Sequence, residues 1–280
     1  MVSKYNFIDK FSMKKDKFIA LLAPSFVVDF TYPDIIFQLK QLGFDKVVEL
    51  TFGAKMINRE YHKKLKNSEK LLISSVCPGI VESLKKDFPE YKKNLMRADS
   101  PMVAMAKICK KIYPTHKIVF ISPCNFKKTE AQNSGFVDFV IDYRELKKIL
   151  DEKNISPSKR DVKFDKFYND STKIYPLAGG LSKTANLKGI VKKEEVKIID
   201  GINDVSIFLK NPDEKVRFLD VTFCKGGCIG GPCISSKLPL FLRKWKVLNY
   251  MKKARKERIP GFRKGLVEKA KGISFATKNL

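Results

Sequence analysis

The chain has 280 residues, the length of one large domain or two small ones. Its apolar fraction of 44% is that of a globular protein and excludes wholesale disorder. No apolar run approaches the ~18 residues that a membrane-spanning helix needs, and the N-terminus lacks the apolar stretch of a secretory signal. We therefore expect a cytoplasmic protein without a membrane span.

Basic residues far outnumber acidic ones, with 56 Lys and Arg against 30 Asp and Glu and a formal net charge of +26. Residues 237–280 hold 14 of the basic residues and two Glu, a net of +12. We predict three segments: an N-terminal segment over 1–16, a main domain over 17–236 and a basic helical tail over 237–280. Such a charge favours nucleic acid, an anionic surface or an acidic protein as the partner.

Short apolar runs alternate with amphipathic segments, which predicts an α/β fold of two lobes with mainly parallel sheets flanked by helices. The polar stretch 152–173 predicts a long loop between lobes over roughly 17–151 and 174–236. Turn, capping and periodicity signals place the elements. In chain order we predict a strand over Phe18–Leu22, a helix over Pro33–Leu42, strands over Lys46–Leu50 and Leu71–Ser75, a helix beginning at Pro101 after the N-cap Ser100, a strand over Ile118–Ile121, a helix from the capping box Asp142–Glu145 through Leu150, strands over Val196–Ile199 and Val216–Phe223, and a helix over Pro239–Lys256.

Four of the six cysteines follow predicted strands directly or closely: Cys77, Cys124, Cys224 and Cys228. Ligands bind outside the carboxyl ends of strands in open α/β sheets, so these thiols could converge on one site. Six cysteines are too few for a disulfide scaffold of this length, and two histidines exclude classical Cys/His zinc fingers. Four thiolates suit either a [4Fe–4S] cluster or a structural zinc ion.

The residues around these cysteines favour iron–sulfur over zinc. Their glycines and tight turns expose backbone N–H groups, which form hydrogen bonds with cluster sulfurs. Structural zinc sites combine two closely spaced cysteine pairs, whereas this chain has one such pair and two single cysteines. Cys109 lies on the apolar stripe of a predicted helix and is interpreted as a core residue. We assign no role to Cys233.

Three segments carry a resemblance to a known family: SSVCPGI, SPCNFKKTEA and TFCKGGCIGGP. They resemble the cysteine motifs in the C-terminal domain of the large chain of [FeFe]-hydrogenases, or iron-only hydrogenases. The similarity runs from about residue 17 to about residue 237 and implies a metal-cluster site between two α/β lobes. It implies that Cys77, Cys124 and Cys224 are ligands of a [4Fe–4S] cubane and that Cys228 bridges the cubane to a two-iron subsite. It also implies that Lys127 contacts a cyanide of that subsite, a role that requires the subsite to be present.

Several positions depart from the family pattern. Val76 stands where the family has its proton-relay cysteine, Ser122 and Thr222 stand where it has methionines that pack the two-iron site, and Ile80 stands where the motif often has tryptophan. The N-terminus has no ferredoxin-type cysteine cluster. These departures argue against a two-iron subsite and hydrogen chemistry. We therefore expect one [4Fe–4S] cluster used in electron transfer or redox sensing, with an acidic electron carrier such as a ferredoxin, or a separate Fe–S protein chain, as the partner.

Two other hypotheses stay open. The chain could be a divergent iron hydrogenase that moves protons by another route. It could also be a basic protein that binds nucleic acid through residues 237–280, where aromatic residues are interleaved with cations. We prefer the interpretation that Phe241, Trp245 and Leu248 form one helix face that packs on the body of the protein.

Overall fold

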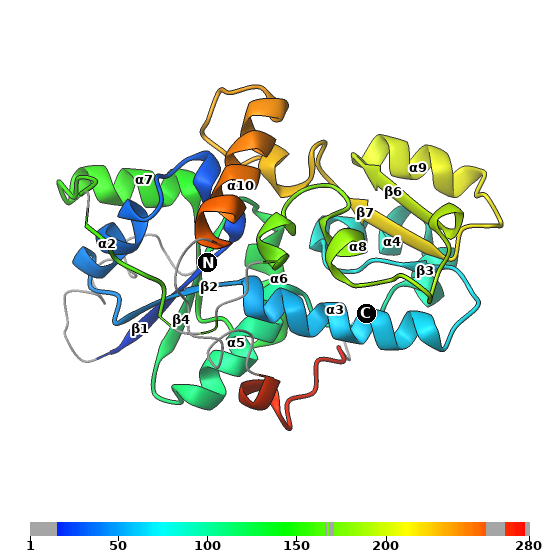
Figure 1. The fold of residues 1–280 in the computed structure, drawn as a ribbon, viewed down its shortest axis with the longest axis horizontal. Coiled ribbons are helices and arrows are strands. Elements are labelled where there is room, and N and C mark those ends of the chain that lie inside the picture. Colours follow the sequence, from blue (N-terminus) through cyan, green and yellow to red (C-terminus); the bar gives the residue numbers. More distant parts are fainter. Residues whose placement is uncertain (1–15, 159, 166, 168–170, 256–266, 278–280) are drawn as a thin grey trace.

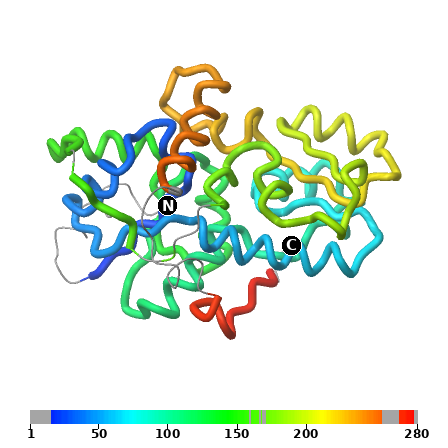
Figure 2. The backbone as a smooth tube through the Cα atoms, viewed as in Figure 1, coloured from blue at the N-terminus to red at the C-terminus, as the bar shows by residue number. Residues whose placement is uncertain are grey.

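Two parallel β-sheets divide the molecule into two lobes that lie side by side (Figures 1 and 2). The computed structural model describes residues 16–158, 160–165, 167, 171–255 and 267–277. The first sheet has the order β2-β1-β4-β5 and the second has the order β3-β7-β6. The strands are β1 (Phe18–Leu22), β2 (Lys46–Glu49), β3 (Leu72–Ile73), β4 (Lys117–Ser122), β5 (Phe139–Asp142), β6 (Val196–Asp200) and β7 (Phe218–Thr222). Each strand pairing in the two sheets is parallel, which confirms the predicted fold class.

Helices flank both sheets (Figure 1). The α-helices are α2 (Asp34–Gln41), α3 (Thr51–Lys66), α4 (Pro78–Asp87), α5 (Pro101–Ile112), α6 (Phe126–Ser134), α7 (Tyr143–Glu152), α8 (Gly180–Thr184), α9 (Ile202–Lys210) and α10 (Leu240–Arg255). Short 3₁₀ turns are η1 (Pro24–Val28), η2 (Pro89–Asn94), η3 (Ser171–Ile174), η4 (Lys193–Glu195), η5 (Gly227–Gly230) and η7 (Val267–Ala270). Within the described ranges, no helix combines the length and the apolar character needed to cross a bilayer.

Local sequence signals place several elements correctly. β1 has the predicted bounds and is buried along its whole length, as strands of a parallel sheet covered on both faces are. Helix α5 begins at Pro101, and the Ser100 hydroxyl accepts a hydrogen bond from the backbone N–H of Val103. The predicted capping box is also present: the Asp142 carboxylate accepts from the Glu145 N–H at 2.9 Å, and the Glu145 carboxylate accepts from the Asp142 N–H at 2.8 Å.

The two sheets are not contiguous in sequence. Strand β3 falls inside the segment 17–151 that we assigned to the first lobe, yet it pairs with β7 in the second sheet, where Leu72 lies opposite Phe218. Helix α3 carries the chain from the first lobe toward the second sheet (Figure 1). A short apolar strand does not indicate its partner, because any neighbouring parallel strand satisfies its backbone groups equally well.

Helix α10 packs on the first lobe, and of the three residues of the predicted face only Leu248 takes part in that packing. Val247 and Tyr250 are buried on the body of the protein, whereas Phe241 is 69% exposed and Trp245 is 60% exposed. Apolar residues lie on both sides of this helix, so periodicity alone does not select the buried one. The residue Lys256, with which the predicted helix ended, lies outside the described residues.

A buried polar network selects the packing face of α10. The Tyr250 hydroxyl donates to Glu49 at the end of β2, and Lys173 of η3 pairs with the same carboxylate and donates to the Tyr250 oxygen at 3.1 Å. The Thr51 hydroxyl adds a further hydrogen bond to Glu49 at 3.1 Å. The side chains of Lys173 and Glu49 are only 6% and 4% exposed. Because burying an unpaired charge is costly, α10 is held with Tyr250 inward.

We expect Lys173→Met to lower the free energy of unfolding by about 3–5 kcal/mol, because the substitution leaves the buried Glu49 carboxylate without its cation. Lys128→Met is the matched control, since Lys128 is 40% exposed and its pair with Glu145 is worth about 0–1 kcal/mol. Urea unfolding curves of both variants and the parent chain measure the difference. Equal midpoints for the two variants would contradict the role given to the buried pair.

Candidate metal centre

The ends of three strands bring three of the predicted cysteines toward the junction of the lobes. Strands β3 and β7 run parallel in the second sheet and end at the same edge. Cys77 follows β3 and directly precedes α4, and Cys224 follows β7. Cys124 comes from the first sheet, in the turn between β4 and α6. Helices α4 and α6 are in contact, so the two lobes meet where these cysteines lie.

A glycine in the first motif allows this meeting. The ring of Phe126, two residues after Cys124, packs edge-on against the ring of Phe223, with centroids 4.9 Å apart. Gly79 lies beneath both rings: a Cβ atom on it would be 2.9 Å from Phe126 and 3.0 Å from Phe223. These distances leave no room for a side chain. The missing side chain therefore lets the loops around Cys77, Cys124 and Cys224 pack against one another.

The loop that carries Cys228 is held on two sides. Gly227 has a positive φ of 76°, and a Cβ atom on it would lie 2.5 Å from the Pro176 carbonyl oxygen. The Cys228 N–H donates to that same oxygen at 2.8 Å. On the other side, a Cβ atom on Gly231 would lie 2.5 Å from the carbonyl oxygen of Pro123, the residue before Cys124. Glycines at these positions let the loop lie between two backbone segments and place Cys228 beside the other motifs.

Electrostatic interactions indicate that the four thiols are neighbours. Burial raises the pKa of Cys124, and the nearby Cys77 raises it further. Burial, then Cys77 and Cys124, raise the pKa of Cys224 to about 12. Burial and the other three thiols raise the pKa of Cys228, while Lys127 opposes them. The thiols with raised pKa values are therefore protonated at neutral pH, and each must release its proton to bind a metal as a thiolate.

Two further observations concern the exposure of Cys228 and the grouping of side chains that could bind a metal ion. Cys228 is an exposed residue, although burial is the largest influence that raises its pKa. Among the residues that the structure describes, no three His, Cys, Asp or Glu side chains are grouped closely enough to hold a single metal ion.

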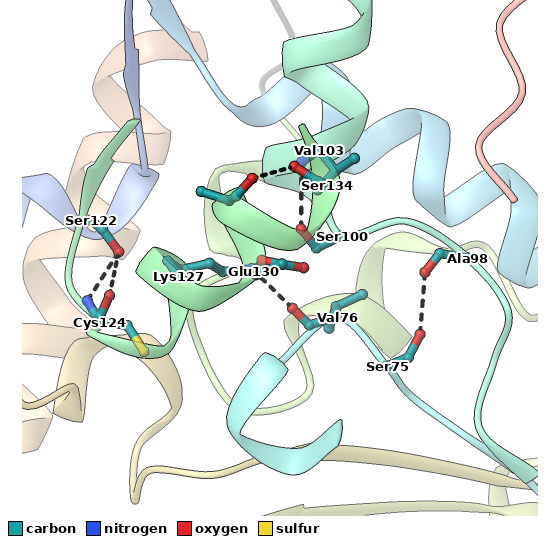
Figure 3. Close-up of polar contacts among 11 residues, drawn as sticks. Ser75, Val76, Ala98, Ser100, Val103, Ser122, Cys124, Lys127, Glu130 and Ser134 are labelled. Atoms are coloured by element: carbon teal, nitrogen blue, oxygen red, sulfur yellow. Dashed lines mark hydrogen bonds and ion pairs between the residues drawn. The ribbon is translucent and has the colours of Figure 1, made fainter. Parts of the chain in front are cut away.

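Lys127 supplies a positive charge that acts on Cys124 and Cys77, and Figure 3 shows its side chain extending toward Glu130 and Val76. Its ammonium group pairs with Glu130, one turn along α6, at 2.6 Å and lies 3.4 Å from the Val76 carbonyl oxygen. The Lys127 side chain is only 13% exposed. Burial lowers its pKa, but Glu130, Cys124 and Cys77 outweigh that effect and raise it. Lys127 is therefore a fixed cation of the centre, held by its own carboxylate partner.

Two hydroxyl groups form hydrogen bonds with the backbone of the turns that carry the cysteines, a role that the sequence analysis did not predict. The Ser122 hydroxyl accepts from the Cys124 N–H at 3.1 Å and donates to the Cys124 carbonyl at 3.0 Å (Figure 3). The Thr222 hydroxyl donates to the Cys224 carbonyl at 3.3 Å. The shared signal is Ser or Thr two residues before a cysteine at the end of a strand, a spacing at which hydroxyls bond to nearby backbone. These side chains therefore turn toward the backbone of the loops.

The remaining two cysteines have other surroundings. Cys109 is fully buried in α5, and burial raises its pKa, which confirms that it is a core residue. Cys233 is also buried, and its thiol donates to the side-chain oxygen of Asn125 at 3.0 Å. That hydrogen bond ties the end of the third motif to the residue after Cys124.

The fold and these contacts define a class: an α/β protein of two parallel-sheet lobes with four neighbouring cysteines where the lobes meet. Within that class, the chain belongs to the family described as the C-terminal domain of the iron only hydrogenase large subunit, and the family model matches residues 16–232. The resemblance read from the three cysteine motifs is thereby confirmed.

Individual relatives show how far the similarity extends. Iron hydrogenase 1 of Clostridium pasteurianum is 29% identical over 250 residues, covering 69% of this chain and 44% of that protein. The cytosolic Fe–S cluster assembly factor NAR1 of Encephalitozoon cuniculi is 22% identical over 221 residues, covering 70% of this chain and 60% of that protein. This chain therefore spans less than half of the hydrogenase. A structure of a variant of the [FeFe]-hydrogenase HydA1 of Chlamydomonas reinhardtii superimposes with a TM-score of 0.69 at 16% identity, covering 95% of this chain and 93% of that one, which shows a common fold.

We expect Gly79→Val to lower the free energy of unfolding by about 1–3 kcal/mol, because its side chain would overlap the Phe126 and Phe223 rings. The same change should speed alkylation of the metal-free cysteines by iodoacetamide, since the three loops would separate. Lys86→Ala, at an exposed position of the same helix, should stay within about 0.5 kcal/mol of the parent chain. Urea unfolding and mass spectrometry provide the two readouts; unchanged values for Gly79→Val would contradict the packing role of this glycine.

Proposed function

We propose that the chain binds one [4Fe–4S] cluster through Cys77, Cys124, Cys224 and Cys228 and acts in one-electron transfer or redox sensing. The observation that carries the proposal is the meeting of the loops that bear the four cysteines, which follow strands of both sheets, where the two lobes join. Four thiolates are the usual ligand set of such a cluster. When bound, the cluster supplies the ability to accept and release one electron.

The surrounding residues suit a redox centre. The rings of Phe126 and Phe223 place apolar surface next to the cysteine loops, and solvent exposure is one of the factors that set a cluster's potential. The buried cation of Lys127 favours added negative charge and therefore favours the reduced state. Ser122 and Thr222 fix the cysteine peptides and so limit rearrangement of the ligand turns on electron transfer.

The residue at the relay position favours electron transfer over hydrogen chemistry. Val76 occupies the place where the family carries a relay thiol, and an aliphatic side chain neither accepts nor donates a proton. The relatives named above include both a hydrogenase and an Fe–S cluster assembly factor, so iron chemistry is what their names share. This overlap supports a role based on the cluster itself.

We expect Cys224→Ala to abolish cluster binding, because it removes the thiol that follows β7. The parent chain, purified anaerobically, should contain about four iron and four sulfide per chain, and the variant close to none of either. Cys233→Ser is the control, since serine keeps a hydrogen-bond donor for Asn125 and leaves the four thiols in place. Full iron content in Cys224→Ala would overturn the assignment, as would a parent chain that holds zinc in place of iron.

A divergent iron hydrogenase is the second candidate, favoured by the position of the Lys127 ammonium group beside the thiols. It requires a two-iron subsite, whose CO and cyanide ligands absorb in the infrared. We expect no such bands after co-expression with the hydrogenase maturation proteins, and no hydrogen uptake or evolution. Bands from metal-bound CO and cyanide, together with about six iron per chain, would establish the hydrogenase and displace our proposal.

A further inference from the structure

Exposed apolar side chains gather at the beginning of α10. Within the described residues, seven large apolar side chains are exposed, and four of them are close in sequence and form what we call the α10 patch: Leu238, Leu240, Phe241 and Trp245. Phe241 and Trp245 are 69% and 60% exposed and lie four residues apart, on one face of the helix. Single exposed apolar residues are ordinary, whereas a contiguous group marks an interaction site.

Positive charge predominates around the α10 patch, although the Asp29 carboxylate lies nearby, where it accepts from the N–H groups of Ser235 and Ser236. The sequence contains no Asp or Glu between residues 221 and 256. Lys237 and Lys244 are exposed within and beside the patch. Aromatic residues at the centre of a surface with cations around them are typical of a protein-binding site, and the predominance of positive charge fits a partner that carries carboxylates.

The α10 patch lies directly on the loop that supplies two of the four thiols. The Leu240 side chain contacts this loop, since a Cβ atom on Gly226 would lie 2.9 Å from Leu240 Cδ2. Arg243 donates to the carbonyl oxygen of Ile229, the residue after Cys228, at 2.9 Å. Figure 1 shows α10 at the upper side of the molecule, near the junction of the lobes. A protein bound to the patch would therefore sit close to the centre, as electron transfer requires, because tunnelling rates fall steeply with distance.

We infer that the α10 patch is the docking surface for an acidic one-electron carrier protein, an assignment that rests on the function proposed above. The aromatic and leucine side chains form the desolvated core of the contact, and Lys237 and Lys244 steer the partner electrostatically. Nucleic acid is a poorer fit, because Leu238 and Leu240 provide no ring on which bases stack. The patch also contacts the Cys224–Cys228 loop. Closeness to the cluster matters for a partner that exchanges electrons, whereas nucleic acid or an anionic membrane would gain nothing from it.

The test is titration of the cluster-loaded chain with an acidic plant-type [2Fe–2S] ferredoxin at low salt. Trp245 is the single tryptophan of the chain, so its fluorescence reports the contact directly, and calorimetry gives Kd for every variant. We expect the double change Phe241→Ser and Trp245→Ser to raise Kd by about tenfold or more. The rate of electron transfer at subsaturating ferredoxin should fall by the same factor, while the iron content stays unchanged.

Two matched controls separate docking from general surface effects. Ile207→Ser removes an equally exposed apolar side chain, 69%, from α9 on the other lobe and should leave Kd unchanged. Lys244→Glu should weaken binding and reduce its salt dependence, whereas Lys66→Glu, at an exposed position of α3, should weaken it far less.

The outcomes distinguish failure of the docking surface from failure of the proposed function. A double variant that binds ferredoxin as tightly as the parent chain would overturn the docking assignment even if the cluster is present. Binding of single-stranded DNA or anionic phosphatidylserine vesicles, lost in the double variant while ferredoxin fails to bind the parent, would overturn it in favour of another partner. A chain without iron would overturn the proposed function, and calorimetry with ferredoxin would still decide whether the α10 patch binds the carrier.

Discussion

The absence of a side chain at Gly79 is the constraint on which the centre depends. It lets the Phe126 and Phe223 rings meet over the start of α4, and that contact joins loops from two separate sheets. Cys77, Cys124 and Cys224 come together because of this contact between the lobes. A side chain at Gly79 would press on both rings and so disturb the contact between these loops.

A second constraint links the buried interior to the outer surface. The network of Glu49, Lys173 and Tyr250 fixes the rotation of α10 about its own axis. Once Tyr250 is inward, Phe241 and Trp245 are left outward, on the helix whose Leu240 and Arg243 contact the loop that carries Cys228. The exposed aromatic surface is thus a consequence of satisfying a buried carboxylate. The same helix joins the stability of the first lobe to the region where a partner would dock.

Two kinds of polar group surround the cysteines: hydroxyls that bond to the backbone of the cysteine turns, and an ion pair that contributes charge. Ser122 and Thr222 hold the peptides of the cysteines that follow them, so the turns are set before any metal binds. Lys127 is placed for its charge, and Glu130 keeps that charge in position. Together they give a centre whose shape is set by hydroxyls and glycines and whose field is set by one buried ion pair.

Elements with local signals, and the set of candidate cysteines, can be predicted from the sequence. β1, the start of α5 at Pro101 and the Asp142–Glu145 capping box were predicted because apolar runs and caps act within a few residues. The sheet that β3 joins and the buried face of α10 emerge only in the folded chain, because both depend on partners distant in the sequence. The same holds for the convergence of the thiols. The positions of the cysteines after predicted strands identify the candidate ligands, but packing between the lobes brings the thiols together.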